Sequence, residues 1–295
     1  MLYVTFSADS TDQRLGAQDG DSIVDITALA RHTGVTVPAD LLTLIRHGGP
    51  QLPELLHHAE VARFKMAATD ITLCAPFRPG KIIGVGLNYT EHVTESARTL
   101  DTAKELPERP VLFDKPATAV IGPGEPIQHD ASLTSQLDWE CELAVVIGRP
   151  AKKVPASQAL DYVFGYSILN DISARDQRRS GQWFFSKGQD SYAPFGPAIL
   201  TADEVFDPHC LDLSLRVNGE VKQKSNTRYM LFKIPELIAD ITSGVTLEPG
   251  DVIATGSPAG VGASFTPQQF LVPGDVVECA VESIGTLRNP VVATR

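Results

Sequence analysis

The sequence lacks the features that would place a protein in or across a membrane. No apolar run approaches the roughly 18 residues that a membrane-spanning helix needs. The first residues, MLYVTFSADS, have neither the basic start nor the apolar centre of a secretory signal. We therefore expect a cytoplasmic protein with no membrane partner. We also find no internal repeat and no low-complexity segment.

Cysteine and positive charge are scarce. The four cysteines lie far apart and form no Cys-x-x-Cys pair, so the sequence predicts neither a zinc site nor a disulfide framework. Lys and Arg number 25 against 36 Asp and Glu, and the formal net charge is -11. This charge opposes nonspecific attraction to nucleic acid or to an anionic membrane surface. A cation is a better suited cofactor.

A phosphate-binding loop is missing too. Residues 256–262, GSPAGVG, are rich in glycine, but no Lys-Ser or Lys-Thr pair follows them and no helix begins there. We interpret the segment as a tight turn that lines a pocket with backbone amides.

The 295 residues allow one or two domains, and 23 Gly and 21 Pro imply many turns and short strands. Residues 2–8 alternate like a strand, residues 14–26 resemble a hairpin, and helical patterns follow at residues 39–48 and 53–64. His57 and His58 would lie on the second helix as surface or core residues rather than ligands. Prolines and a glycine in residues 74–80 indicate a linker. We predict a small α+β domain over residues 1–75.

The rest of the chain, residues 76–295, is predicted to form a β-rich domain of sandwich or barrel type, so the fold class is α+β. A hairpin is expected at Asn218-Gly219, and the segments around it alternate in short strands with turn signals.

Residues 137–148, LDWECELAVVIG, place three carboxylates before an apolar run. In a strand, Asp138, Glu140 and Glu142 would share one face. Burying them would require a positive partner. The segment is therefore a solvated edge strand, or its carboxylates meet a Lys or Arg, or they bind a metal ion.

A metal site needs a third ligand from elsewhere. The apolar strand VFGYSIL ends in Asn170-Asp171, and Asp171 is either a helix N-cap or the carboxylate that joins Glu140 and Glu142. Three carboxylates without thiol or imidazole select a hard divalent ion, Mg²⁺ above all, with Mn²⁺ or Ca²⁺ as alternatives.

Two further segments carry candidate catalytic groups. Asn88 and Glu91 resemble a capping box that starts a helix, on which Glu95 would orient His92 as a general base; the alternative is an ordinary surface helix. Lys187 and Asp190 lie in a loop rich in aromatics, glycine and proline. Lys187 is either a solvated surface charge or a group that stabilises developing negative charge.

Taken together, several segments resemble the fumarylacetoacetate hydrolase family and occur in that family's order between about residues 80 and 292. They are GVGLNYTEHVTE, PVLFDKPATAVIGPG, DWECELAVVIG, GYSILNDISARD, KGQDSYAPFGPAI, VNGEVKQ, LEPGDVIATGSPAGVG and ESIGTLRNPV. Residues 1–75 resemble, more weakly, the small N-terminal domain of bacterial members.

The resemblance implies a mixed β-sandwich roll, usually a homodimer, in which Glu140, Glu142 and Asp171 hold the metal. It makes His92 and Glu95 a catalytic dyad on a lid helix and Lys187 an active-site lysine. Substrate contacts would come from the matching motifs and loops: Arg175, Arg178, Asp190, Thr255 and Gly256. The chain departs from the family at Ser257, where Thr is common, and at Gln177-Arg178, where a Gln is shifted.

The expected substrate is a small 2-oxo acid that chelates the metal. The main expectation is a hydrolase that cleaves the C3–C4 bond of 2,4-dioxo acids such as acylpyruvates, giving a 2-oxo acid and a carboxylic acid. The alternative is a decarboxylase or isomerase of 2-oxo dicarboxylic acids, of the oxaloacetate or 2-hydroxyhepta-2,4-dienedioate type, through the same metal enolate. A catalytically silent binding protein on this fold is the third reading.

Overall fold

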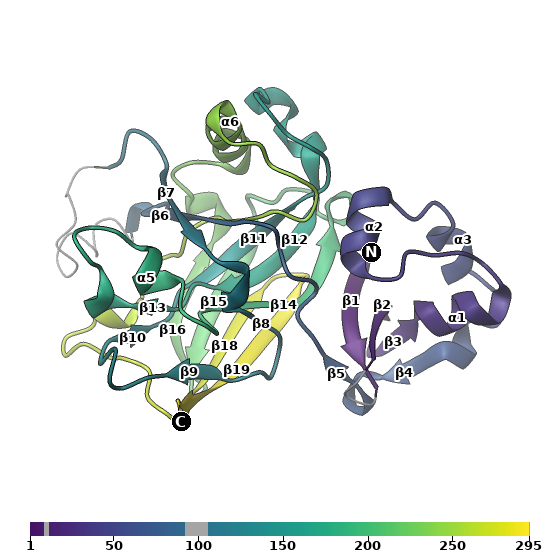
Figure 1. Cartoon of the computed structure of the whole chain (residues 1–295), viewed down its shortest axis with the longest axis horizontal. Helices are drawn as coiled ribbons and strands as arrows, with labels where there is room; N and C mark the ends of the chain where they lie inside the picture. Colours follow the sequence, from purple (N-terminus) through teal and green to yellow (C-terminus); the bar gives the residue numbers. More distant parts are fainter. Residues whose placement is uncertain (9–11, 92–105, 295) are drawn as a thin grey trace.

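A computed structural model describes residues 1–8, 12–91 and 106–294 (Figure 1). Within these ranges, twelve strands form one large sheet. Ten of them follow one another in a single order, and two short strands pair beside this path. The strands, in spatial order, are β4 (Lys65–Ala67), β3 (Ser22–Asp25), β2 (Gln13–Asp19), β1 (Leu2–Ser7), β14 (Ala193–Thr201), β12 (Val163–Asn170), β11 (Cys141–Ile147), β17 (Val252–Ala254), β6 (Ile82–Gly86) and β7 (Val111–Lys115), with β5 (Thr72–Leu73) beside β1 and β8 (Val120–Ile121) beside β14.

A second sheet packs against the middle of the first. Its order is β16 (Glu220–Asn226), β15 (Asp212–Val217), β18 (Val276–Val281), β19 (Gly285–Ala293) and β9 (Ile127–His129). The hairpin between β15 and β16 turns at Asn218 and Gly219, both with positive φ as the Asn-Gly pair predicts. The β-rich α+β architecture expected from the sequence is confirmed.

The main hydrophobic core lies between the two sheets. Alternate residues of β11, such as Leu143 and Val145, point into it, where they join Leu215 of β15 and Val277 of β18. The other alternate residues, Ala144 and Val146, belong to a second core. Because both faces of β11 are covered, no residue of this strand is exposed to water.

That second core is shared with the N-terminal elements, which lie on one side of the molecule (Figure 1). They include the helices α1 (Ile26–Thr33), α2 (Leu41–His47) and α3 (Leu52–Leu56). Strand β1 pairs with β14, so the large sheet continues without a break from the N-terminal strands into the strands that follow the predicted linker. The domain boundary at residue 76 stays a prediction.

One expectation about helices needs correction. Helix α3 ends at Leu56 and a separate 3₁₀ turn covers Val61–Phe64, so His57 and His58 follow the helix instead of lying on it. Helix α6 (Ile234–Gly244) was not predicted from the sequence. Its apolar positions recur at helical spacing and are buried. No helix in the described part of the chain is long and apolar enough to span a membrane.

Candidate active site

Three carboxylates converge where β11 begins and β12 ends. Cys141 of β11 pairs with Asn170 of β12, which brings Glu140 and Glu142 next to Asp171, the residue after β12. The Asp171 amide donates to the Glu140 carbonyl oxygen at 2.8 Å, which ties the two chain segments together. One oxygen from each of the three carboxylates lies within 4.8 Å of the others, and all three residues are buried. The structure therefore brings together the predicted metal ligands and excludes a solvated edge strand.

Asp138 does not join this cluster, contrary to the expectation that it shares their face. The strand is interrupted: Leu137–Asp138 form β10, which pairs with β13 (Ser173–Ala174), and β11 starts only at Cys141. The Asp138 carboxylate accepts hydrogen bonds from the backbone amides of Gly262 at 2.6 Å and Ala263 at 3.0 Å. It is thereby turned toward another loop.

Two cationic side chains meet the buried carboxylates. Arg175 donates from Nε to Asp138 at 2.9 Å and places Nη2 2.6 Å from Glu140. The Lys187 ammonium donates to Glu140 at 2.9 Å and also bonds Asp171. Lys187 is the last residue of α5 (Phe184–Lys187), and it is 5% exposed, so it is not a solvated surface charge. Arg175, expected to contact substrate, is here the counter-ion of two carboxylates.

A third cation, Lys115, was not predicted. It ends β7 and is completely buried, and its ammonium donates to Asp171 Oδ1 at 2.6 Å. The sequence did carry a signal for it. Lys115 shares the inward face of β7 with Val111 and Phe113, while Leu112 and Asp114 are exposed.

Burial and mutual repulsion dominate the electrostatics of the cluster. Burial, followed by the charges of Asp171 and Glu140, raises the pKa of Glu142 well above its usual range. Burial alone would lower the pKa of Lys187, but attraction to Asp171 and Glu140 outweighs it, and the pKa is raised. Lys187 is therefore an ammonium at neutral pH. Among the described residues, four carboxylates, including Asp138, face three cations here.

The glycine-rich segment contacts the cluster through its backbone. The amide of Gly256 donates to Glu142 Oε2 at 2.9 Å, as expected for a turn that lines a pocket with amides. Gly256 has φ +97°, and a Cβ on it would lie 2.7 Å from Asn88 Cβ and 2.9 Å from the Val85 carbonyl oxygen. Glycine is required here by both conformation and space. The Thr255 hydroxyl donates to the Leu143 carbonyl at 2.8 Å.

Asn88 has a different role from the predicted helix cap. Its side-chain amide donates to the carbonyls of Thr255 at 2.7 Å and Phe232 at 3.0 Å, and its oxygen accepts from the Phe232 amide. These bonds fasten the end of β6 to the Gly256 turn. The predicted dyad, His92 and Glu95, lies outside the described residues.

Arg178 lies at the end of an aromatic stack. Its guanidinium is 4.9 Å from the Trp183 ring, Trp183 is 5.4 Å from the ring of Phe113, and the Lys187 ammonium is 4.8 Å from that same ring. The distances are measured to ring centroids. The stack connects a partly exposed cation with the buried lysine.

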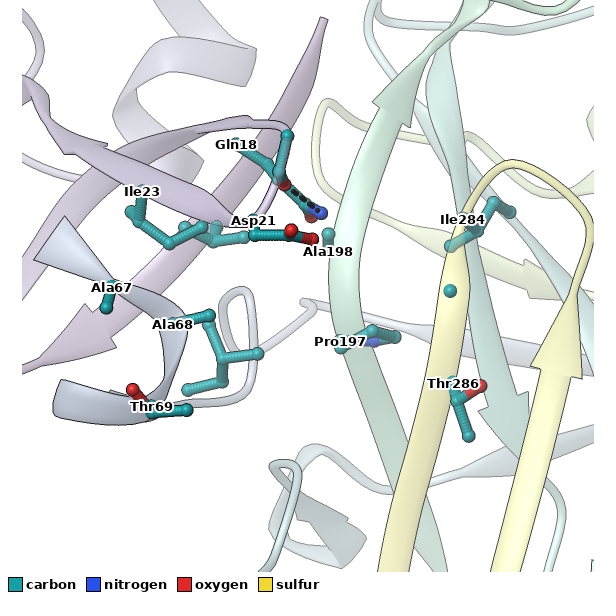
Figure 2. A pocket seen from close by; sticks show the side chains of 14 residues that line it. Gln18, Asp21, Ile23, Ala67, Ala68, Thr69, Pro197, Ala198, Ile284 and Thr286 are labelled. Carbon is teal, nitrogen blue, oxygen red and sulfur yellow. Dashed lines mark hydrogen bonds between the residues drawn. The ribbon is translucent and has the colours of Figure 1, made fainter. Parts of the chain in front are cut away.

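Asp190 lies elsewhere. It is exposed and lines a cavity of about 550 Å³ together with Arg78 and Glu125, without any of the three clustered carboxylates. A second cavity, of about 560 Å³, lies between the β2–β3 turn on one side and β14 with the start of β19 on the other (Figure 2). Its described lining is mainly apolar and includes the acidic side chain of Asp21. Neither cavity includes the carboxylate cluster.

The residues of the cluster suit a divalent cation. Their donors are hard oxygens, which Mg²⁺, Mn²⁺ and Ca²⁺ prefer. The raised pKa of Glu142 marks a buried carboxylate whose charged form lacks compensation, and a bound cation would supply it. The ammonium of Lys187, which bridges Glu140 and Asp171, already stands in for part of that charge.

Comparison with known proteins gives a consistent result. Residues 81–292 match the model of the fumarylacetoacetate (FAA) hydrolase C-terminal domain. The chain is 38% identical to the mitochondrial oxaloacetate tautomerase fahd2 of Xenopus laevis over 99% of this chain and 90% of that protein. It is 40% identical to the oxaloacetate tautomerase YisK of Bacillus subtilis over 87% of each.

Among solved structures, maleylpyruvate hydrolase from Sphingobium sp. SYK-6, in complex with manganese(II) and pyruvate, matches with a TM-score of 0.80. The two are 32% identical, and each chain is covered completely. The family resemblance seen in the sequence is therefore confirmed: the chain is an enzyme that belongs to the fumarylacetoacetate hydrolase family.

Proposed function

We propose that the protein catalyses keto–enol tautomerisation of a 2-oxo dicarboxylic acid of the oxaloacetate type, with a divalent cation as cofactor. The observation that carries the proposal is the pair of oxaloacetate tautomerases that match nearly the whole chain, taken with the intact carboxylate cluster. This was the alternative from the sequence. The main expectation, hydrolysis of a C–C bond, has weaker support.

Glu140, Glu142 and Asp171 would hold the cation, Mg²⁺ or Mn²⁺. When bound, the cation supplies a Lewis acid that polarises the 2-oxo group. Tautomerisation breaks a C3–H bond and forms an O–H bond at the 2-oxo oxygen, or the reverse, so the protein must move one proton between two sites. We do not assign the base to the cluster, because Glu140 and Asp171 are paired with lysines and Glu142 would be committed to the cation.

Lys187 is the group that we assign to the oxygen side of this transfer. It remains protonated, it lies against two of the proposed ligands, and it can donate to an oxygen on which negative charge develops. For the carbon side we keep the sequence-based proposal that His92, oriented by Glu95, exchanges the C3 proton. No water is required as a nucleophile.

A second candidate is hydrolysis of an acylpyruvate, supported by the maleylpyruvate hydrolase among the similar structures. It would use the same carboxylates and lysine but would need a water activated by His92. Because both reactions would use His92, the substitution His92→Ala distinguishes them only when the products are analysed as well. We also propose, from the sequence and the resemblance, a cytoplasmic homodimer without a nucleic-acid or membrane partner.

The test follows the ultraviolet absorbance of enol-oxaloacetate after dilution into buffer with the purified protein and Mn²⁺. Tautomerase activity predicts that absorbance decays faster than in buffer, that EDTA abolishes the acceleration, and that neither CO₂ nor pyruvate accumulates. Release of CO₂ with pyruvate would assign a decarboxylase instead. If only maleylpyruvate or another acylpyruvate were consumed, the tautomerase proposal would be rejected in favour of the hydrolase.

A further inference from the structure

Among the buried cations that the structure describes at the site, Lys115 has been given no function above. It is the last residue of β7, and its side chain is 0% exposed. A buried ammonium is stable only when its charge and its three N–H donors are satisfied.

The three donors of Lys115 have three acceptors on two different elements. Nζ donates to Asp171 Oδ1 at 2.6 Å, to the Ile172 carbonyl at 3.3 Å, and to the carbonyl of Lys187. One ammonium thus joins the end of β12 to the end of α5.

Asp171 is shared between two lysines, one for each of its oxygens. Lys115 bonds Oδ1, while Lys187 bonds Oδ2 and at the same time Glu140 Oε2. Oδ2 is therefore the oxygen that shares a lysine with Glu140, whereas Oδ1 is bonded by Lys115.

The residues that follow the two lysines are packed against each other. A Cβ on Gly188 would lie 2.8 Å from Pro116 Cδ and 2.6 Å from the Phe184 carbonyl oxygen. The end of α5 therefore rests directly on the turn after β7. A displacement of Lys115 would be transmitted to the backbone of Lys187.

We propose that Lys115 is a positioning residue with two effects, an inference that rests on the metal site proposed above. It occupies one oxygen of Asp171, so that Asp171 presents a single oxygen to the divalent cation. It also fixes the backbone of Lys187, so that this ammonium points at the carboxylates. The positive charge of Lys115 weakens binding of the divalent cation. Its hydrogen bond to the Lys187 backbone supports turnover by holding Lys187 in place.

The two effects predict opposite changes in one variant. In Lys115→Met a similar volume is kept, but a positive charge close to the ligands is lost and Oδ1 of Asp171 becomes available. Mn²⁺ should bind at least about tenfold more tightly, because a unit charge a few ångströms away acts strongly in a buried site. The kcat should fall about a hundredfold, as expected when a catalytic group is displaced by about 1 Å.

The experiment titrates Mn²⁺ into metal-free, full-length protein by calorimetry and measures oxaloacetate tautomerisation in parallel. The control is Lys81→Met, which removes a lysine that pairs at 2.6 Å with the buried Asp251, away from the carboxylate cluster. This control should lose stability without a change in Mn²⁺ affinity. Unchanged or weaker Mn²⁺ binding in Lys115→Met would overturn the proposal, since a purely structural lysine predicts that result.

Lys115→Arg covers the case in which Lys115→Met does not fold. It keeps the charge but replaces three radiating donors by a planar guanidinium. Mn²⁺ affinity should stay near that of the wild type and kcat should fall, whereas a wild-type kcat would contradict the positioning role. If the wild type binds Mn²⁺ but leaves oxaloacetate unchanged, the proposed reaction fails, and the Mn²⁺ titrations alone decide the role of Lys115.

Discussion

Asp138 and Glu142 are buried carboxylates four residues apart, yet their surroundings differ. Asp138 accepts from Arg175 and from the amides of Gly262 and Ala263. Glu142 accepts from one amide, that of Gly256, and two other carboxylates lie beside it. The first carboxylate is fully compensated by the protein, and the second is not.

This difference separates a structural acid from a ligand. A carboxylate with complete hydrogen bonds and a guanidinium partner stabilises the loops that it joins. A carboxylate that lies among like charges and has a raised pKa favours the binding of a cation. The two regions lie side by side in the sequence, and three substitutions can sharpen or break the distinction.

The largest effect is expected for Glu142→Gln. We expect the variant to lose Mn²⁺ binding and to lose activity by about a thousandfold or more, because the metal and its charge stabilisation disappear together. Thermal stability should be unchanged or higher, since a poorly compensated buried charge has been removed. Calorimetric titration, the tautomerase assay and thermal unfolding measure the three quantities.

The control is Glu278→Gln, which breaks a partly exposed 3.5 Å pair with Arg288 and should change none of them. Retained Mn²⁺ binding in Glu142→Gln would place the ligands elsewhere.

Asp138→Asn should act on folding instead. Arg175 would lose one of its two carboxylate partners in a buried site, and the free energy of unfolding should fall by about 3 kcal/mol. Urea unfolding measures the loss. The folded protein should bind Mn²⁺ as the wild type does. If Mn²⁺ affinity fell while stability was kept, Asp138 would belong with the ligands and the distinction would be wrong.

Gly256→Ala gives the smallest effect. Its φ of +97° and the close Asn88 and Val85 atoms should cost about 1–2 kcal/mol of stability, and the shifted amide should reduce activity about tenfold because Glu142 loses the hydrogen bond from Gly256. The matched control is Gly285→Ala, with φ +119° but only Pro197 Cγ nearby at 3.5 Å. It should lower stability alone. Equal activity in both variants would show that the Gly256 amide is dispensable.

The sequence predicted the proposed ligands because alternation in a strand is a strong signal and because Asp171 ends an apolar strand. It left Lys or Arg partners and a metal as alternatives, and the structure shows that cationic partners are present while the oxygens remain gathered. Strand alternation could not reveal the interruption at Trp139, because the break depends on long-range contacts. One of them is the bond from the Glu140 amide to the Asn170 side chain.

Lys115 and α6 were missed for different reasons. A lysine at a strand end is normally solvated, and its burial here depends on Asp171, which lies 56 residues away in the chain. Helix α6 carried local signals that we did not use: Pro235 in its first turn, and buried apolar residues at Ile234, Leu237, Ile238 and Ile241.

The pairing of β1 with β14 also has a consequence for solubility. Tyr3 opposite Ile199 and Leu2 opposite Leu200 place the N-terminal strand beside β14 of the large sheet. Without β1, part of the apolar strand β14 would become a free edge, with unpaired amides and carbonyls ready to recruit a strand from another chain. Strand β1 thus protects β14 against edge-to-edge aggregation.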